Sequence, residues 1–184
     1  MYPKIDFEYY KGLVADPDNP DNVYDGSGNG KYYGKDTPVV FGSYTKLVGI
    51  HFIDGDVDIE ADLDIIGGAI FATGKIEVHG NRIITRTQTA GYDSPLAIIA
   101  KGYIVLKGVV SVTGIIQTEG TLRLEISAKN NSITVNDGAV IADEGILSGG
   151  GKGIDIFYDP NLSVENIVGT GIEIYKIISW QEID

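Results

Sequence analysis

The chain has 184 residues, of which 43% are hydrophobic and 22% are charged, a composition typical of a single soluble globular domain. Its net charge of −12 disfavours binding to nucleic acid or to an anionic membrane surface, because both require clustered lysine and arginine. The absence of cysteine excludes disulfides and thiolate metal sites. The sequence contains no run of about 18 uncharged apolar residues, so it predicts no membrane-spanning helix.

The first predicted element is a short helix over residues 6–14. Phe7, Tyr10 and Val14 lie on one face at helical spacing, and Asp6 is placed to cap the first turn. Gly12 weakens this prediction, because glycine lowers helix propensity.

Residues 16–37 are rich in Asp, Asn, Gly and Pro and are predicted to form a loop. Carboxylate oxygens are the ligands that calcium prefers, so the loop offers one candidate metal site. Its candidate ligands are Asp16, Asp18, Asp21 and Asp25. The spacing does not match an EF-hand loop, and turns without metal have the same composition, so both interpretations stay open.

From residue 38 the chain repeats one pattern of alternating apolar residues around a central position. That position falls at Gly55, Gly74, Gly102, Gly120 and Glu144, at steps of 19, 28, 18 and 24 residues. The basic period is therefore 18–19 residues, with insertions at 81–95 and 127–131 that we expect to be surface excursions. Glycine at the corners is expected to supply the φ values of a tight bend.

Three short strands per repeat predict an all-β fold, a single-stranded parallel β-helix of about five coils. Equivalent side chains should then stack in columns. One predicted column holds Ile70, Ile98, Ile116 and Val140, and a narrower one holds Ala72, Ala100, Thr118 and Ala142. The competing fold is an antiparallel sandwich, but most corners lack Asn-Gly or Asp-Gly hairpin turns. A right-handed coil is expected by analogy with other parallel β-helices.

The pattern divides the chain into three parts: a helix and loop cap at 1–37, the β-helix at 38–160, and a C-terminal cap at 161–184. Open β-helix ends expose unpaired backbone, so caps are expected at both ends. Residues 172–183 are predicted to form a closing strand, with Trp180 as a plug.

Catalytic patterns are scarce, and we expect no enzymatic activity and no cofactor apart from the candidate calcium. The two histidines are assigned by the repeat, His51 to an inward column and His79 to the outer surface. A row of acids with a period of two is expected to point outward as a solvated face, too evenly spread to converge on one ion. The row comprises Asp54, Asp56, Asp58, Glu60, Asp62 and Asp64.

Three segments together resemble the C-terminal domain of PilX-like type IV pilus assembly proteins. They are the coil text Gly-x-Ile-x-Ala-x-Gly-x-Ile-x-Val-x-Gly, Tyr-Asp-Pro-Asn-Leu at 158–162, and Ser-Trp-Gln-Glu at 179–182. The opening at 5–11 is also similar to the entry segment of that family. The family places a hydrophobic pilin-type helix ahead of an extracellular β-helical domain, and this chain lacks that helix. The coil text alone is also similar to bactofilins, which are polymer-forming cytoskeletal proteins.

The resemblance implies a non-catalytic extracellular module for structure or adhesion, with pilus or cell-surface proteins as partners and a glycan as a further candidate. Localisation at the cell surface is expected if an upstream segment precedes the domain, and cytoplasmic localisation otherwise. Two alternatives stay open: a self-polymerising bactofilin-like subunit, and a β-helix protein that binds or cleaves carbohydrate.

Overall fold

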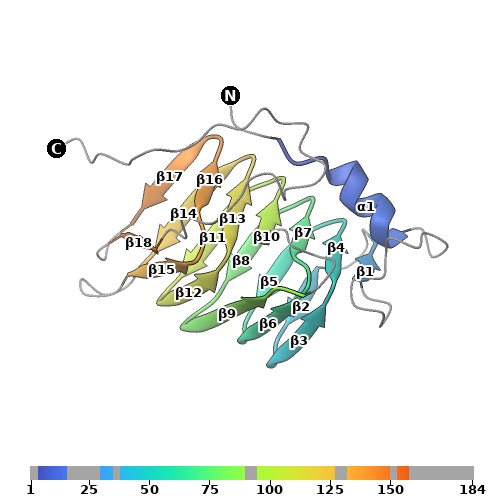
Figure 1. Cartoon of the computed structure of the whole chain (residues 1–184). Coiled ribbons are helices and arrows are strands. Elements are labelled where there is room, and N and C mark those ends of the chain that lie inside the picture. Colours follow the sequence, from blue (N-terminus) through green and yellow to red (C-terminus); the bar gives the residue numbers. More distant parts are fainter. Residues whose placement is uncertain are drawn as a thin grey trace.

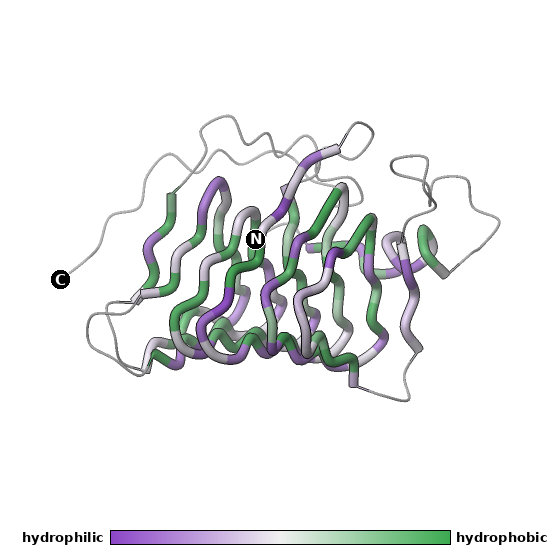
Figure 2. Tube along the Cα trace, turned by 90° about the horizontal axis from the view of Figure 1, so that it is seen from below, coloured by the Kyte–Doolittle hydropathy of each residue, from purple (hydrophilic) through white to green (hydrophobic). Residues whose placement is uncertain are grey.

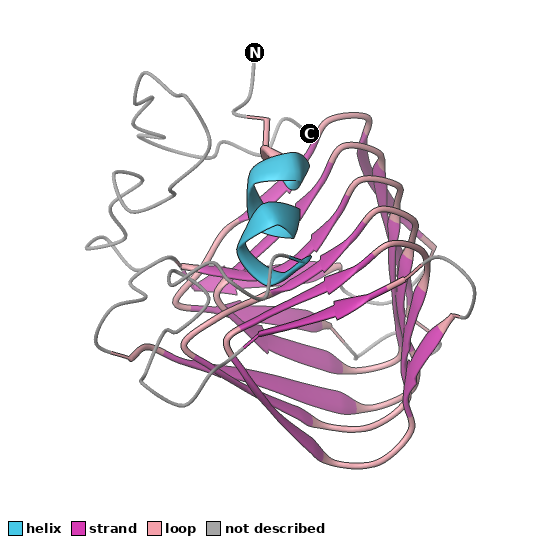
Figure 3. Cartoon of the chain, turned by 90° about the vertical axis from the view of Figure 1, so that its right-hand side faces the viewer, coloured by secondary structure: helices cyan, strands magenta, loops and turns pink. Residues whose placement is uncertain are grey.

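The computed structural model describes residues 4–15, 30–34, 38–89, 95–126, 132–149 and 153–157. They form a parallel β-solenoid preceded by one helix, α1 (Phe7–Ala15) (Figure 1). Viewed along its axis, the solenoid has three sides, each of which is one parallel sheet (Figure 3). The predicted fold class is confirmed.

Each sheet holds six strands, and each strand pairs in parallel with the strand three positions further along the chain. Sheet A contains β1 (Gly30–Tyr33), β4 (Ile50–Ile53), β7 (Ile70–Ala72), β10 (Leu96–Ala100), β13 (Ile115–Thr118) and β16 (Val140–Ala142). Sheet B contains β2 (Val39–Phe41), β5 (Val57–Ile59), β8 (Ile76–Val78), β11 (Ile104–Lys107), β14 (Thr121–Glu125) and β17 (Gly145–Ser148). Sheet C contains β3 (Thr45–Val48), β6 (Leu63–Ile66), β9 (Arg82–Thr87), β12 (Val110–Thr113), β15 (Ile133–Asn136) and β18 (Ile154–Phe157). Three strands therefore make one coil, and the eighteen described strands make six coils, the first being β1–β3, the second β4–β6, the third β7–β9 and the fourth β10–β12.

The predicted columns exist. Ile98 pairs with Ile70 on one side and with Ile116 on the other, and Ile116 pairs with Val140. The same strands place Ala100 between Ala72 and Thr118. These side chains are buried in one continuous interior core, and apolar residues recur at the same places in successive coils (Figure 2). Burial of equivalent side chains against one another is what stabilises the stack.

The central corner glycines are required for a different reason from the one predicted. At Gly74, Gly102 and Gly120 the φ angle is not positive, and each amide donates a 2.9 Å hydrogen bond to the glycine carbonyl of the coil before it. A Cβ on Gly102 would lie 2.7 Å from the carbonyl oxygen of Gly74. Close approach of backbone to backbone therefore excludes a side chain here. The φ argument does hold at Gly80 and Gly108, at 76° and 85°.

Sheet A is buried on both faces. Its inward residues belong to the interior core, and its outward residues form a second apolar cluster with α1. The Phe7 ring meets Phe52 and Phe71 edge-on, and the Tyr10 ring stacks on Phe71 with centroids 4.1 Å apart. The helix thus covers the outer face of sheet A at its N-terminal end (Figures 1 and 3).

The helix prediction is confirmed within one residue at each end, and so is its cap, because the Tyr9 amide donates to Asp6 Oδ1 at 3.0 Å. The prediction of loop throughout 16–37 is wrong at its end. Residues 30–33 form β1, which pairs with β4, so the solenoid begins before residue 38. The predicted C-terminal cap, with its strand at 172–183 and Trp180, lies outside the described residues. No helix in the described ranges has the length and hydrophobicity to span a bilayer.

Candidate functional site

Carboxylates of the acidic row, which lies on the second coil, accept hydrogen bonds from residues of the third coil. Asp56 Oδ1 accepts from the Lys75 amide and Asp62 Oδ1 from the Ile83 amide, both at 2.9 Å. Asp64 accepts from the Thr85 hydroxyl. These carboxylates satisfy backbone donors at corners where the ladder is interrupted. The row is therefore a set of links between coils rather than only a solvated face.

Asp54 does not point into solvent as predicted. Its residue is only 7% exposed, and its carboxylate accepts from Thr73 Oγ1 at 3.0 Å, Tyr32 Oη at 3.3 Å and Lys11 Nζ at 3.4 Å. The side chain lies outward as alternation predicts, but Tyr32 and the helix α1 cover it there, so the carboxylate is buried instead of solvated. Asp54 instead joins three elements: the helix, the first coil and the third coil.

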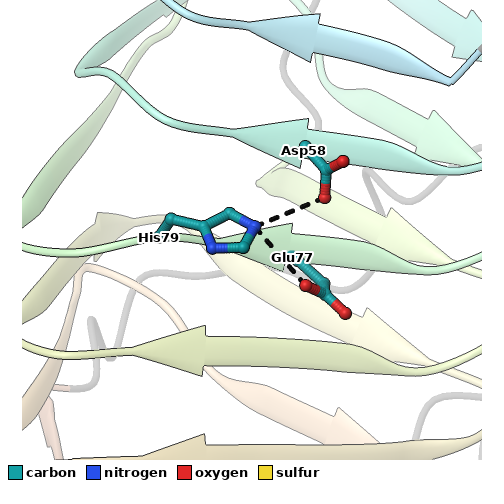
Figure 4. Close-up of side chains that lie close together, drawn as sticks. All are labelled: Asp58, Glu77 and His79. Atoms are coloured by element: carbon teal, nitrogen blue, oxygen red, sulfur yellow. Dashed lines mark hydrogen bonds and ion pairs between the residues drawn. The ribbon is translucent and has the colours of Figure 1, made fainter.

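The outer face of sheet B brings together three side chains of metal-binding type, Asp58, Glu77 and His79 (Figure 4). Asp58 lies on β5, Glu77 lies on β8, and His79 follows directly after β8. The His79 Nε2 atom is 3.4 Å from Asp58 Oδ1 and 3.4 Å from Glu77 Oε2. All three side chains are partly exposed, and their ligand atoms lie within 4.8 Å of one another.

Two lysines form ion pairs with the Glu77 carboxylate. Lys75 Nζ is 2.9 Å from Oε1, and Lys107 Nζ is 3.1 Å from Oε2. The hydrogen bond from Lys75, reinforced by Lys107, lowers the pKa of Glu77 although partial burial opposes this. The same bond raises the pKa of Lys75.

This charge arrangement limits what the site does chemically. The two carboxylates and two ammonium groups cancel, so the cluster does not concentrate cations. A metal would have to displace Lys107 from Glu77 before all three side chains bound it. Glu77, held ionised, is poorly suited to donate a proton near neutral pH. The geometry is that of an ion-pair network linking the second, third and fourth coils.

The outward position of His79 was predicted, but its convergence with Asp58 and Glu77 was not. The signal is present in the spacing, because Asp58 and Glu77 are 19 residues apart and pair directly across the ladder. A step of one period therefore places Glu77 beside Asp58. The same step leads from residue 60 to His79, which follows Glu77 by two residues. His51 occupies an inward column beside Ile70, as predicted.

The predicted calcium ligands Asp16, Asp18, Asp21 and Asp25 lie outside the described residues, so this site stays a prediction. A thermal melt with and without a chelator tests it. If calcium binds there, the chelator lowers the melting temperature of the parent, and the double variant Asp16→Asn with Asp18→Asn abolishes that drop.

Comparison of the chain with models of protein families, with curated proteins and with solved structures finds no match. The fold itself defines the class, a three-sided parallel β-solenoid with one helix packed on its side. Solenoids of one shape carry unrelated functions, so the function is argued from the surface residues.

Proposed function

We propose that this chain is a non-catalytic structural or adhesive module, displayed outside the cell by a type IV pilus-like assembly. It acts as a stiff spacer that holds its outer faces toward partners on pili or cell surfaces. The motifs at 158–162 and 179–182, with the coil text, are the basis for the pilus-like context.

The observation that carries the non-catalytic part of the proposal is the use of the polar outer side chains. Asp54, Asp56, Asp62 and Asp64 each bond to the following coil. Glu77 is held by two lysines. Acids committed to such bonds stabilise a rigid stack and are not poised for proton transfer.

The packing of α1 supports a module held by its N-terminal side. Phe7 lies against Phe71 on the third coil, and Val14 lies beside Gly30 on the first. The helix therefore runs along the side of the stack, fixed by the outer cluster of sheet A and by the Lys11–Asp54 ion pair.

The bactofilin-like alternative requires both ends of the solenoid to accept another subunit. The inward positions of the first coil carry the polar residues Lys31, Tyr33 and Thr45 beside the apolar residues Val39, Phe41 and Leu47. The polar ones favour contact with water over stacking at this terminal repeat. The carbohydrate alternative, in its catalytic form, requires acids free to contact a sugar, and every acid of the second-coil row except Glu60 bonds to another described residue.

Cell-surface labelling tests the proposal. Antibodies to the chain should label intact source cells, and the chain should appear in the fraction of sheared surface appendages. Labelling only after permeabilisation would contradict the proposal. Electron microscopy of purified protein should show single particles, since long filaments would favour the bactofilin-like alternative. Selective binding on a glycan array would favour the carbohydrate alternative.

A further inference from the structure

His51 lies in the interior of the solenoid, at the junction between the first and second coils. Its backbone pairs with Lys31 of β1 on one side and with Ile70 of β7 on the other. The residue is only 8% exposed. The column that is apolar from Ile70 onward thus becomes polar toward the N-terminal end.

Two hydrogen bonds fix the imidazole to the first coil. Nε2 is 3.2 Å from the Val48 carbonyl oxygen, at the end of β3, and Nδ1 is 3.1 Å from Tyr33 Oη on β1. A carbonyl only accepts, so Nε2 carries the proton, and Nδ1 accepts from the tyrosine hydroxyl. Both bonds therefore use the neutral form of the ring.

The groups around the ring disfavour a positive charge. Burial lowers the pKa of His51 to about 4, with a further decrease from Lys31 on β1, although the bond to Val48 opposes both. Among the described elements that pack on it, β7 contributes the apolar Ile70 and β3 only a carbonyl. Tyr33 on β1 stays neutral, since burial raises the pKa of its hydroxyl. Asp54, which directly follows β4, is already bonded to Thr73 and Lys11.

We propose that the first coil is an acid-sensitive element, in which protonation of His51 releases β1 from β4 while the later coils stay folded. The first coil has another coil on one side only, with α1 packed on the outer face of β1, and terminal coils are the least stable part of a stack. When β1 separates from β4, water reaches the imidazole from the side of β1, whereas Ile70 covers the other side of the ring. The inference concerns conformation and does not depend on the pilus-like role proposed above.

The sign of the pH dependence follows from linkage. The opened form binds a proton near pH 6.5 and the closed form near pH 4, so the opened form binds more protons between these values. Closure is therefore fully stabilised above about pH 6.5 and weakens as the pH falls toward 4. Between pH 7 and pH 5 the population of the opened form should rise roughly 20-fold.

Amide hydrogen exchange, corrected for the intrinsic effect of pH, measures this opening directly. Protection of the amides at β1 and of their partners in β4 should fall roughly 20-fold from pH 7 to pH 5, and protection of β10 and β13 should not change. An unchanged β1, or an equal loss in β10 and β13, would overturn the proposal.

Two variants assign the effect to the imidazole. His51→Gln keeps a donor toward Val48 but does not titrate, so the pH dependence at β1 should disappear. His79→Gln, which changes the other histidine of the chain, should keep it. If His51→Gln does not fold, Tyr33→Phe retains the imidazole and should open β1 more at every pH with the same dependence. Loss of the dependence in His79→Gln, or its absence in Tyr33→Phe, would contradict the role of His51.

Discussion

At the residue scale, glycine at the central corner is the most constrained choice in the repeat. Gly74, Gly102 and Gly120 follow one another at single-coil distance, and each amide bonds to the carbonyl below. A side chain at these positions would enter the backbone of the neighbouring coil. The glycine column is thus a consequence of stacking rather than of turn type.

Gly102→Ala tests this explanation. The added Cβ would lie 2.7 Å from a carbonyl oxygen in the backbone of the preceding coil, which has little freedom to move. We expect a loss of about 1–3 kcal/mol in the free energy of unfolding, measured by urea denaturation.

Gly55→Ala is the matched control. Gly55 occupies the same column, also without a positive φ, but a Cβ there would meet no atom of the described residues within 4 Å. Its stability should stay within about 0.5 kcal/mol of the parent. Equal costs for the two substitutions would show that local backbone conformation, not stacking, selects glycine.

At the element scale, the helix and sheet A depend on each other. Phe52, Phe71 and Ile99 are outward on their strands yet fully buried. Their burial explains why the β7 and β10 sequences are apolar without interruption, as is typical of parallel strands covered on both faces. The acid Asp54 adds a polar link between the helix and the stack.

Asp54→Ala should destabilise the protein by about 1–3 kcal/mol, because Thr73 loses its acceptor and Tyr32 and Lys11 lose theirs at a buried position. Lys11→Met should have a smaller effect, since the Lys11 side chain is 31% exposed and the Asp54 side chain only 9%, and partly exposed ion pairs contribute little. Urea denaturation measures both. A larger loss for Lys11→Met would mean that the ion pair, rather than the hydrogen bonds of Asp54, holds the helix.

The sequence was sufficient to predict the coils, because Ile70, Ile98 and Ile116 recur with alternating neighbours and glycine corners. It was not sufficient for β1, because the sequence Gly-Lys-Tyr-Tyr lacks that alternation. This segment forms a strand through its pairing with β4. It also failed at Asp54, because α1 and Tyr32 cover the outer face at that point and bury an acid that was expected in solvent.

The cluster on sheet B was missed for another reason. Asp58 and Glu77 are distant in sequence and meet only when the exact period of one coil is applied. The involvement of Lys107 requires a second period that includes an insertion, since 30 residues separate it from Glu77. Long-range convergence therefore depends on insertion lengths, which periodicity alone does not fix.

At the scale of the whole molecule, the two described ends of the stack differ. The inward positions of the first coil include Lys31 and Tyr33 beside the apolar Phe41 and Leu47, whereas those of the last include Val140, Ile146 and Ile154, which are partly buried. The two ends therefore differ, because the first coil mixes polar and apolar inward residues. A stiff body with unlike ends suits a spacer attached at one side.

The solenoid architecture requires parallel coils stacked in one register, and cysteine cross-linking measures that register directly. The chain has no cysteine, so each introduced pair stands alone. Ser111 pairs with Thr134, and Thr134 pairs with Asp155, all on the outer face of sheet C. Neighbouring strands lie about 4.8 Å apart, within disulfide range, and alternate strands about twice as far, beyond it.

The double variant Ser111→Cys with Thr134→Cys should therefore form an intramolecular disulfide readily under mild oxidation of the folded protein. Its control, Ser111→Cys with Asp155→Cys, should not. Rapid cross-linking of both pairs, or of the control alone, would contradict the stacked register on which the fold, the rigid spacer and the acid-sensitive first coil all depend.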